Sequence, residues 1–220
     1  MTGPLVSVVT PTWGRPELLL ERCIPSVMAQ TYQPLEHLVV IDGHDIDLRS
    51  RRMMLGYSLI LGTSRRLVEC GRNHGGVGHA ARAAGAFLAA GEWICYLDDD
   101  NAYLPNHVEA MVAEAQRTGA ELVTTAWQTP DGDVGGWPPP GTNHTDSSSM
   151  LHRADLLTRV SAWQPADGYA ADGALVDRWV AAGVRWSFLP EPTLIYHPPG
   201  DAAAYRAWLA TEAARAGVPT

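Results

Sequence analysis

Trp93-Ile94-Cys95-Tyr96-Leu97-Asp98-Asp99-Asp100 joins a short apolar run to three consecutive carboxylates. The apolar run is rich in β-forming residues and follows Gly91, so it predicts a buried strand. Carboxylates at the end of such a strand repel one another, and a hard divalent cation, Mg²⁺ or Mn²⁺, is the simplest compensation. Because side chains alternate along an extended chain, Asp98 and Asp100 are predicted to share a face while Asp99 points away. The alternative is a solvated turn after the strand.

The composition is that of an ordinary soluble globular protein and excludes some partners. The chain has 220 residues, of which 46% are hydrophobic and 18% charged, with a net charge of -8. This charge argues against nucleic-acid binding, which needs a basic surface. We expect no integral membrane segment and no signal peptide. Cys23, Cys70 and Cys95 are an odd number with no metal-ligand spacing, so reduced thiols in the cytoplasm are expected.

Strand-like and helix-like segments alternate around the aspartates. Strands are expected at residues 5–10, 38–41, 66–70, 93–97 and 122–127, and helices at about 16–30, 48–61, 79–90 and 105–118. This alternation predicts an α/β fold with a mostly parallel, Rossmann-like central sheet flanked by helices.

The amino-acid composition of the chain changes after Gln128. Residues 129–149 are rich in Pro, Gly, Asp and Ser, and we expect a long loop that is functional or disordered. Helices are expected from near 154, at 172–182 and at 202–216, with short strands around Trp186 and Leu194.

Polar residues follow several of the predicted strands. Pro11, Thr12 and Trp13 follow the first strand, Asp42 follows the second, and the aspartates follow the strand at 93–97. In an open parallel sheet, ligands bind beyond the carboxyl ends of the strands. We therefore expect these residues to line one crevice.

Five segments in collinear order carry a family resemblance. They are Val6-Ser7-Val8-Val9-Thr10-Pro11-Thr12-Trp13, Val39-Val40-Ile41-Asp42-Gly43, Asn73 with Gly78 and Ala81-Arg82, Leu97-Asp98-Asp99-Asp100, and Asp172 with Arg178 and Ala182-Gly183-Val184-Arg185. Together they resemble the family 2 glycosyltransferases with the GT-A fold. Where that family often has two acidic residues, this chain has Ile41-Asp42 and Ala171-Asp172, and each keeps the second acid.

The resemblance covers the chain from about Leu5 to His197 and implies one glycosyltransferase domain over residues 1–220. Residues 1–101 would form the nucleotide-sugar half, and residues 102–220 the half that binds the acceptor and carries the catalytic base. The implied activity is metal-dependent, inverting transfer of a sugar from a nucleotide donor, expected to be UDP-linked, to a hydroxyl of a soluble small molecule or glycan.

The same resemblance implies roles for residues at the donor side. Asp42 would contact the base, and the remaining nucleotide contacts would come from Pro11, Thr12, Trp13, Arg82, Asp98 and Asp99. Asp100 would bind Mn²⁺ or Mg²⁺, with His197 as a further ligand. From the residues alone, Asp42 could instead shape the turn before Gly43, and Arg82 could lie on a solvated helix face.

On the acceptor side the resemblance makes Asp172 the general base, which must reach the attacking hydroxyl. The alternative is that Asp172 caps the following helix, which would lower its pKa and make it a poorer base; Asp177 would then be the fallback. Trp137, His144 and Asp146 in the long loop are candidate acceptor contacts, since aromatic rings stack well on sugars.

Two rival functions remain at this stage. A sugar-nucleotide pyrophosphorylase should carry a glycine-rich nucleotide loop with a basic residue just after the first strand, which Thr10-Pro11-Thr12-Trp13-Gly14-Arg15 does not resemble. A non-catalytic nucleotide- or glycan-binding domain should have lost Asp100 or Asp172, and both are present.

Overall fold

A computed structural model of the chain describes residues 3–43, 64–75, 78–164, 170–198, 200–215 and 217. Its strands are β1 (Val6–Thr12), β2 (Leu35–Asp42), β3 (Ser64–Cys70), β4 (Trp93–Tyr96), β5 (Ala102–Tyr103), β6 (Leu122–Gln128), β7 (Val134–Gly135), β8 (Met150–Arg153) and β9 (Trp186–Ile195). Its helical segments are α1 (Pro16–Leu18), η1 (Leu19–Cys23), α2 (Ile24–Met28), α4 (His79–Leu88), α5 (His107–Thr118), η3 (Ser147–Ser149), α6 (Leu156–Arg159), α7 (Ala171–Ala181) and α8 (Ala202–Arg215).

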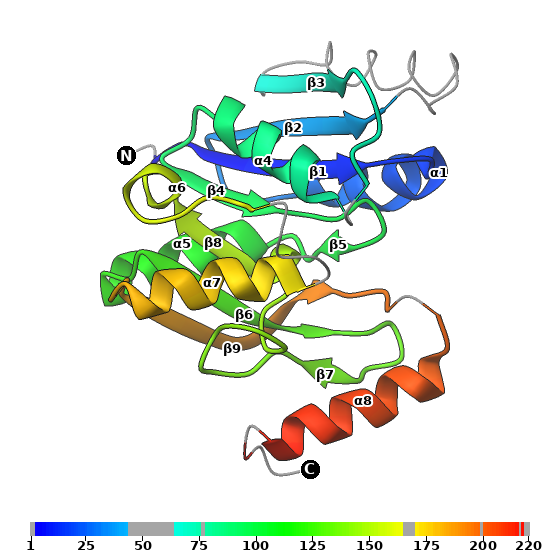
Figure 1. The fold of residues 1–220 in the computed structure, drawn as a ribbon, viewed down its shortest axis with the longest axis vertical. Helices are drawn as coiled ribbons and strands as arrows, with labels where there is room; N and C mark the ends of the chain where they lie inside the picture. The colour runs from blue at the N-terminus through cyan, green and yellow to red at the C-terminus, as the bar shows by residue number, and fades with distance from the viewer. Residues whose placement is uncertain are drawn as a thin grey trace.

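The strands of the described residues form one nine-stranded sheet in the order β3-β2-β1-β4-β8-β6-β9-β5, with β7 paired to β6 (Figure 1). β1 runs parallel to both β2 and β4, and β2 runs parallel to β3. β8 is antiparallel to its neighbours β4 and β6, and β6 is parallel to β9. The sheet is therefore mostly parallel, as the alternation of elements predicts.

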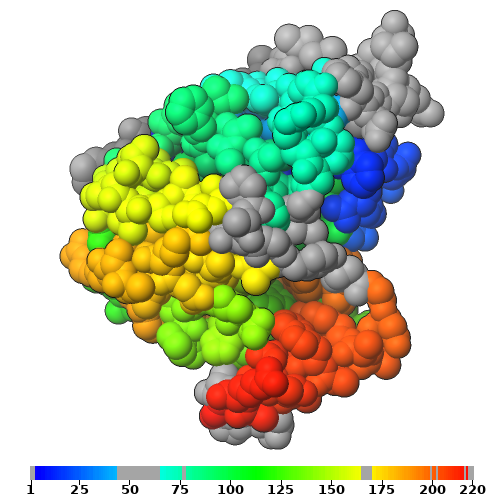
Figure 2. Space-filling view, viewed as in Figure 1, coloured from blue at the N-terminus to red at the C-terminus, as the bar shows by residue number. Residues whose placement is uncertain are grey.

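Alternating side chains of the central strands feed two apolar cores, one on each face of the sheet. Val8 and Cys95 pack in the core that includes residues of η1, α2 and α5. Val9 and Ile94 pack in the other, with residues of α4 and α7. Figure 1 shows α4, α6 and α7 on the near face of the sheet, and Figure 2 shows their surfaces as adjoining teal, yellow and orange bands.

Several element boundaries differ from the sequence-based predictions. The helix expected at 16–30 is divided by the π-helical turn η1, and Pro25, which lacks a backbone N–H, lies in the first turn of α2. The two short strands expected near Trp186 and Leu194 are one strand, β9, which contains two prolines and pairs with β6 through an irregular register. The helix expected at 48–61 lies outside the described residues.

The segment expected as a long loop has structure of its own. It contains β7 and the short helix η3. Beyond β9, Tyr205, Leu209 and Ala213 of α8 pack against Trp137 of this segment. Within the described ranges, every helix is too short or too polar to cross a membrane.

We expect Gly91→Ala to destabilise the fold, because a Cβ at this position would lie 2.5 Å from the Ser7 hydroxyl oxygen and 2.7 Å from the Ser7 backbone nitrogen. Overpacking against backbone costs about 1–3 kcal/mol, measurable as a lower urea midpoint. Gly71→Ala is the matched control, since nothing lies within 4 Å of its added Cβ. Equal losses in the two variants would contradict the steric explanation.

Candidate active site

A cavity of about 810 Å³ opens beyond the carboxyl ends of β1, β2 and β4. Parallel neighbours bring these strand ends to one edge of the sheet, which is where ligands bind in open α/β folds. Of the residues predicted from the sequence, the cavity is lined by Pro11, Thr12, Trp13, Asp42, Arg82, Asp98, Asp100, Asp146, Asp172 and His197.

The three consecutive aspartates have different surroundings. Asp98 and Asp100 line the cavity, whereas Asp99 is completely buried, as the alternation of side chains predicts. Asp99 accepts a hydrogen bond from the Thr12 hydroxyl (2.7 Å) and pairs with Arg15 (2.5 Å). Burial raises the pKa of Asp99 to about 7 against the opposing effects of Arg15 and Thr12. In the structure, Asp99 therefore ties β1 to the end of β4.

Arg82 is the buried cation among the acids of the cavity. Its guanidinium pairs with Asp98, and the side chain is only 9% exposed. Burial alone would lower the pKa of Arg82, but the negative charges of Asp98 and Asp172 raise it. The helix that was predicted to carry Arg82 thus presents it to the cavity rather than to solvent.

Asp172 lies in the first turn of α7 and faces the cavity. It accepts hydrogen bonds from the backbone N–H groups of Gly173 (2.9 Å) and Ser147 (3.1 Å). The N-cap is Ala170, so the capping role considered for Asp172 is not the one observed. Burial raises the pKa of Asp172 despite these hydrogen bonds and the charge of Arg82. A carboxylate with a raised pKa is a better proton acceptor than an exposed one.

Asp146 lies near Asp172 and Asp98, and the charges of these two aspartates act on its pKa. It caps η3 by accepting a hydrogen bond from the Ser148 backbone N–H at 2.8 Å. Burial and the negative charges of Asp98 and Asp172 raise the pKa of Asp146 to about 8. The cavity therefore has a second acidic side chain with a raised pKa near Asp172.

The residues around Asp100 fit a divalent cation. Burial and the charge of Asp98 raise the pKa of Asp100, whose Oδ2 pairs with Arg15 at 2.5 Å. His197 Nδ1 is buried and has no hydrogen-bond partner among the described residues. Burial and the charge of Arg22 lower the pKa of His197, which favours the neutral, metal-binding form. Mg²⁺ is commonly held by one or two protein groups together with water and substrate phosphates.

Three predicted residues do not line this cavity. One is Asp99, whose contacts are described above. Trp137 is buried in the small cluster beneath α8, and His144 donates its Nδ1–H to the Pro139 carbonyl (3.0 Å) with its ring roughly perpendicular to that of Trp137. The expected acceptor contacts of Trp137 and His144 thus have no support from the geometry of this cavity.

Sequence reasoning missed several cavity residues, among them Asn101, Trp163 and Tyr196. Trp163 donates its indole N–H to the Tyr96 hydroxyl (2.9 Å), and the Arg82 guanidinium lies 5.8 Å from its ring centre. Tyr196 follows the end of β9 beside His197, so the strand-end rule could have found it. Trp163 follows no pattern in the sequence, because its position depends on how the segment after α6 folds back.

Similar folds occur in solved glycosyltransferase structures. The chain superposes with a TM-score of 0.71 on Staphylococcus aureus TarS in complex with UDP-GlcNAc, at 16% identity, covering 90% of this chain and 60% of that one. It superposes with a TM-score of 0.73 on the mannosyltransferase PcManGT from Pyrobaculum calidifontis in complex with GDP-Man and Mn²⁺, at 19% identity, covering 96% and 64%. These likenesses confirm the predicted GT-A-like fold.

Curated sequences show the same relationship. The chain is 33% identical over 126 residues to a protein of Escherichia coli K12 described as a putative colanic acid biosynthesis glycosyl transferase, WcaA, covering 57% of this chain and 41% of that protein. It is 29% identical over 119 residues to the glycosyltransferase GlyG of Streptococcus pneumoniae, covering 54% and 38%. The chain thus spans about two fifths of the length of these relatives.

The family model described as glycosyl transferase family 2 matches residues 7–174. The match runs from β1 to the first turn of α7 and so includes the aspartate triplet and Asp172. With the collinear motifs and the shared fold, it establishes that this chain belongs to glycosyltransferase family 2.

Proposed function

We propose that this chain transfers a sugar from a UDP-linked donor to an acceptor hydroxyl with inversion at the anomeric carbon. The observation that carries the proposal is that one cavity is lined both by Asp98 and Asp100, which follow β4, and by Asp172 on α7. The aspartates after β4 suit the binding of a nucleoside diphosphate with its metal ion, and Asp172 suits removal of a proton from the acceptor hydroxyl. Solved relatives in complex with UDP-GlcNAc, UDP and GDP-Man support a nucleotide-sugar donor.

Each step follows from side chains of the cavity. Asp42 holds the base at the end of β2, while Asp98 and Arg82 hold the ribose and phosphate region. Asp100 and His197 would bind Mn²⁺ or Mg²⁺, which as a Lewis acid would stabilise the negative charge of the departing diphosphate. Asp172 accepts the proton of the acceptor hydroxyl while its oxygen bonds to the anomeric carbon. The bond from that carbon to the diphosphate oxygen breaks, and UDP leaves.

We also propose that the chain acts as one catalytic domain. Residues 1–101 would bind the donor and residues 102–220 would hold the acceptor, with Asp146 as its contact nearest the base. The acceptor would be a soluble small molecule or glycan. A cytoplasmic location stays a prediction that rests on the unpaired thiols.

We expect Mn²⁺ or Mg²⁺ to strengthen the binding of UDP by at least about tenfold, and Asp100→Ala to remove that gain. The reason is that the diphosphate and Asp100 would share the ion. Isothermal titration calorimetry with UDP, with and without metal, measures both effects. Asp155→Ala is the control, because Asp155 is an exposed acid paired with Arg153 and Arg159. Metal-independent UDP binding of equal strength would refute the metal assignment.

A screen of nucleotide-sugars tests the class of reaction and the donor together. We expect one nucleotide-sugar to raise the melting temperature and to release its nucleoside diphosphate in the presence of Mn²⁺ or Mg²⁺. Release of a nucleoside triphosphate on addition of pyrophosphate would instead identify a pyrophosphorylase. Binding without turnover, with any acceptor, would identify a nucleotide-binding domain.

A further inference from the structure

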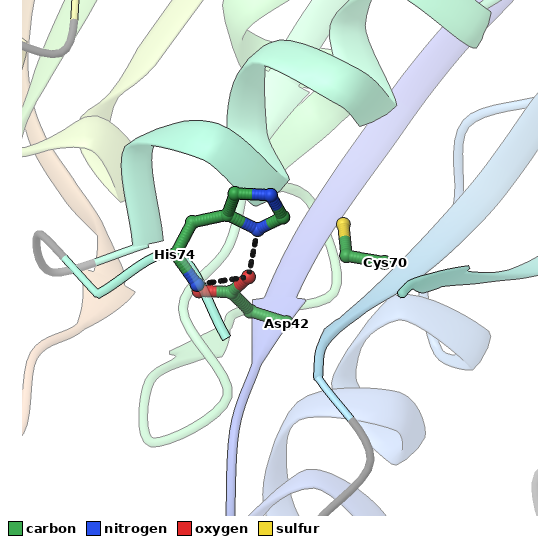
Figure 3. Close-up of side chains that lie close together, drawn as sticks. All are labelled: Asp42, Cys70 and His74. Carbon is green, nitrogen blue, oxygen red and sulfur yellow. Dashed lines mark hydrogen bonds and ion pairs between the residues drawn. The ribbon is translucent and has the colours of Figure 1, made fainter. Parts of the chain in front are cut away.

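At the carboxyl ends of β2 and β3, beside the cavity, three side chains of different chemistry lie together. The parallel register of β2 and β3 pairs Asp42 with Cys70, so both lie at the carboxyl ends of adjacent strands. The chain then returns, and His74 reaches Asp42. Figure 3 shows the carboxylate, thiol and imidazole of these three residues gathered beside the ends of the two strands.

The potential ligand atoms of the three residues lie within 4.8 Å of one another, the one such set of three found among the described residues. Two atoms bound to one tetrahedral Zn²⁺ lie about 3.3–3.8 Å apart, given bonds of about 2.0–2.3 Å. Small side-chain rotations would therefore close the set around an ion. Asp42 is buried and lines the cavity, Cys70 is partly buried and His74 is exposed, so the set borders the cavity and has one ligand group at the surface.

The loop after β3 holds the imidazole in place. Asn73 donates its side-chain amide to the Asp42 carbonyl (3.1 Å) and accepts from the Gly75 N–H (2.7 Å). Gly75 has a φ of +64°, which few other residues adopt readily. The His74 backbone N–H (3.1 Å) and ring Nδ1 (2.8 Å) both contact Asp42 Oδ1. Two of the three groups are thus ordered before any ion binds.

We propose that Asp42, Cys70 and His74 form a Zn²⁺ site, with the fourth position open to water. Thiolate and imidazole favour Zn²⁺, whereas the carboxylates around Asp100 favour Mg²⁺ or Mn²⁺. The two sites therefore select different ions. On binding, the Cys70 S–H bond breaks, a Zn–S bond forms and the proton passes to water; no redox change occurs.

Zinc at this site excludes the base of the donor nucleotide. This consequence rests on the proposed function, in which Asp42 contacts that base. An Asp42 oxygen bound to Zn²⁺ is not available to a base N–H, and the ion with its water fills the space beside it. Zinc would therefore act as an inhibitor that competes with the donor, separate from the ion at Asp100.

Titration with Co²⁺, which takes zinc sites and reports a thiolate ligand by charge-transfer absorption, tests the metal site directly. We expect the band in the wild-type protein, its bleaching by one equivalent of Zn²⁺, and its loss in Cys70→Ala. His74→Ala should weaken zinc binding by more than about 100-fold. Asp100→Asn, which alters the other end of the cavity, should keep the band. A missing band, or zinc binding that depends on Asp100 and not on Cys70, would overturn the site.

Nuclear magnetic resonance with uridine tests the exclusion of the base, because uridine has no phosphate to chelate the ion. We expect one equivalent of Zn²⁺ to displace uridine from the wild-type protein and not from Cys70→Ala. Uridine that stays bound to the zinc-loaded wild type would overturn the inhibitory role. If uridine and guanosine bind neither protein, the proposed base contact of Asp42 is wrong, whereas the cobalt spectrum still reports the metal site.

Discussion

Asp172→Asn is expected to lower kcat by about 10²–10⁴-fold, the usual contribution of a general base, while UDP affinity changes little. Asparagine keeps the size of the side chain, but its one oxygen can replace only one of the two carboxylate oxygens that accept from the Ser147 and Gly173 N–H groups, and it cannot accept the acceptor proton. Steady-state kinetics with the donor found by the nucleotide-sugar screen, together with UDP calorimetry, separate the two effects.

Asp177→Asn is the matched control for this experiment. Asp177 lies on the same helix but does not line the cavity, and it accepts hydrogen bonds from Thr142. We expect it to keep most of the activity. If Asp177→Asn is inactive and Asp172→Asn is active, the base has been assigned to the wrong residue.

The pH profile gives an independent check on Asp172. A base works in its ionised form, so kcat should rise with pH through the pKa of Asp172 in the complex. Burial raises this pKa above that of an exposed aspartate, so the acidic limb should lie at a higher pH than an ordinary carboxylate would produce. An acidic limb at the ordinary carboxylate pKa would contradict the burial of the base.

Arg82→Gln is expected to destabilise the protein by about 3 kcal/mol, because removal of the buried guanidinium leaves the partly buried Asp98 without its cation. The loss should appear as a lower urea midpoint. The same change should move the acidic limb of the pH profile to higher pH, because the charge of Arg82 lowers the pKa of both Asp172 and Asp146. Arg82→Lys should recover part of both effects.

Arg159→Gln is the control for this substitution. Arg159 is half exposed and pairs with Glu121 and Asp155 at the surface, where such pairs contribute at most about 1 kcal/mol. Equal destabilisation by the two arginine variants, or an Arg82→Gln protein with an unshifted pH profile, would show that Arg82 does not act as the counter-ion of the cavity acids.

The fold class and the strand-end residues of the cavity were predictable from local pattern. The apolar run before Asp98 and the β-branched run before Pro11 are buried strands, and their parallel pairing places Thr12, Asp42 and Asp98 at one edge. The spacing of apolar residues and the ends of strands can be predicted because both depend on residues close together in the chain.

Contacts between distant segments were not predictable in the same way. Trp163 reaches the cavity because it packs on Tyr96 and Arg82, residues more than 60 positions away, and no local pattern records such a contact. Trp137, expected to meet the acceptor, instead packs against Leu209 of α8 because an apolar ring is more stable in a core.

The sequence by itself determined the alternation of strands and helices, the family and the acids at the strand ends, since each follows from residues close together in the chain. The tertiary structure decided which acids share a counter-ion and that burial raises the pKa of Asp172. It also decided that Cys70, whose spacing from the other cysteines indicated no metal, lies beside Asp42 and His74. The physical reason is that burial and charge depend on distance in space, which strand register and loop closure set.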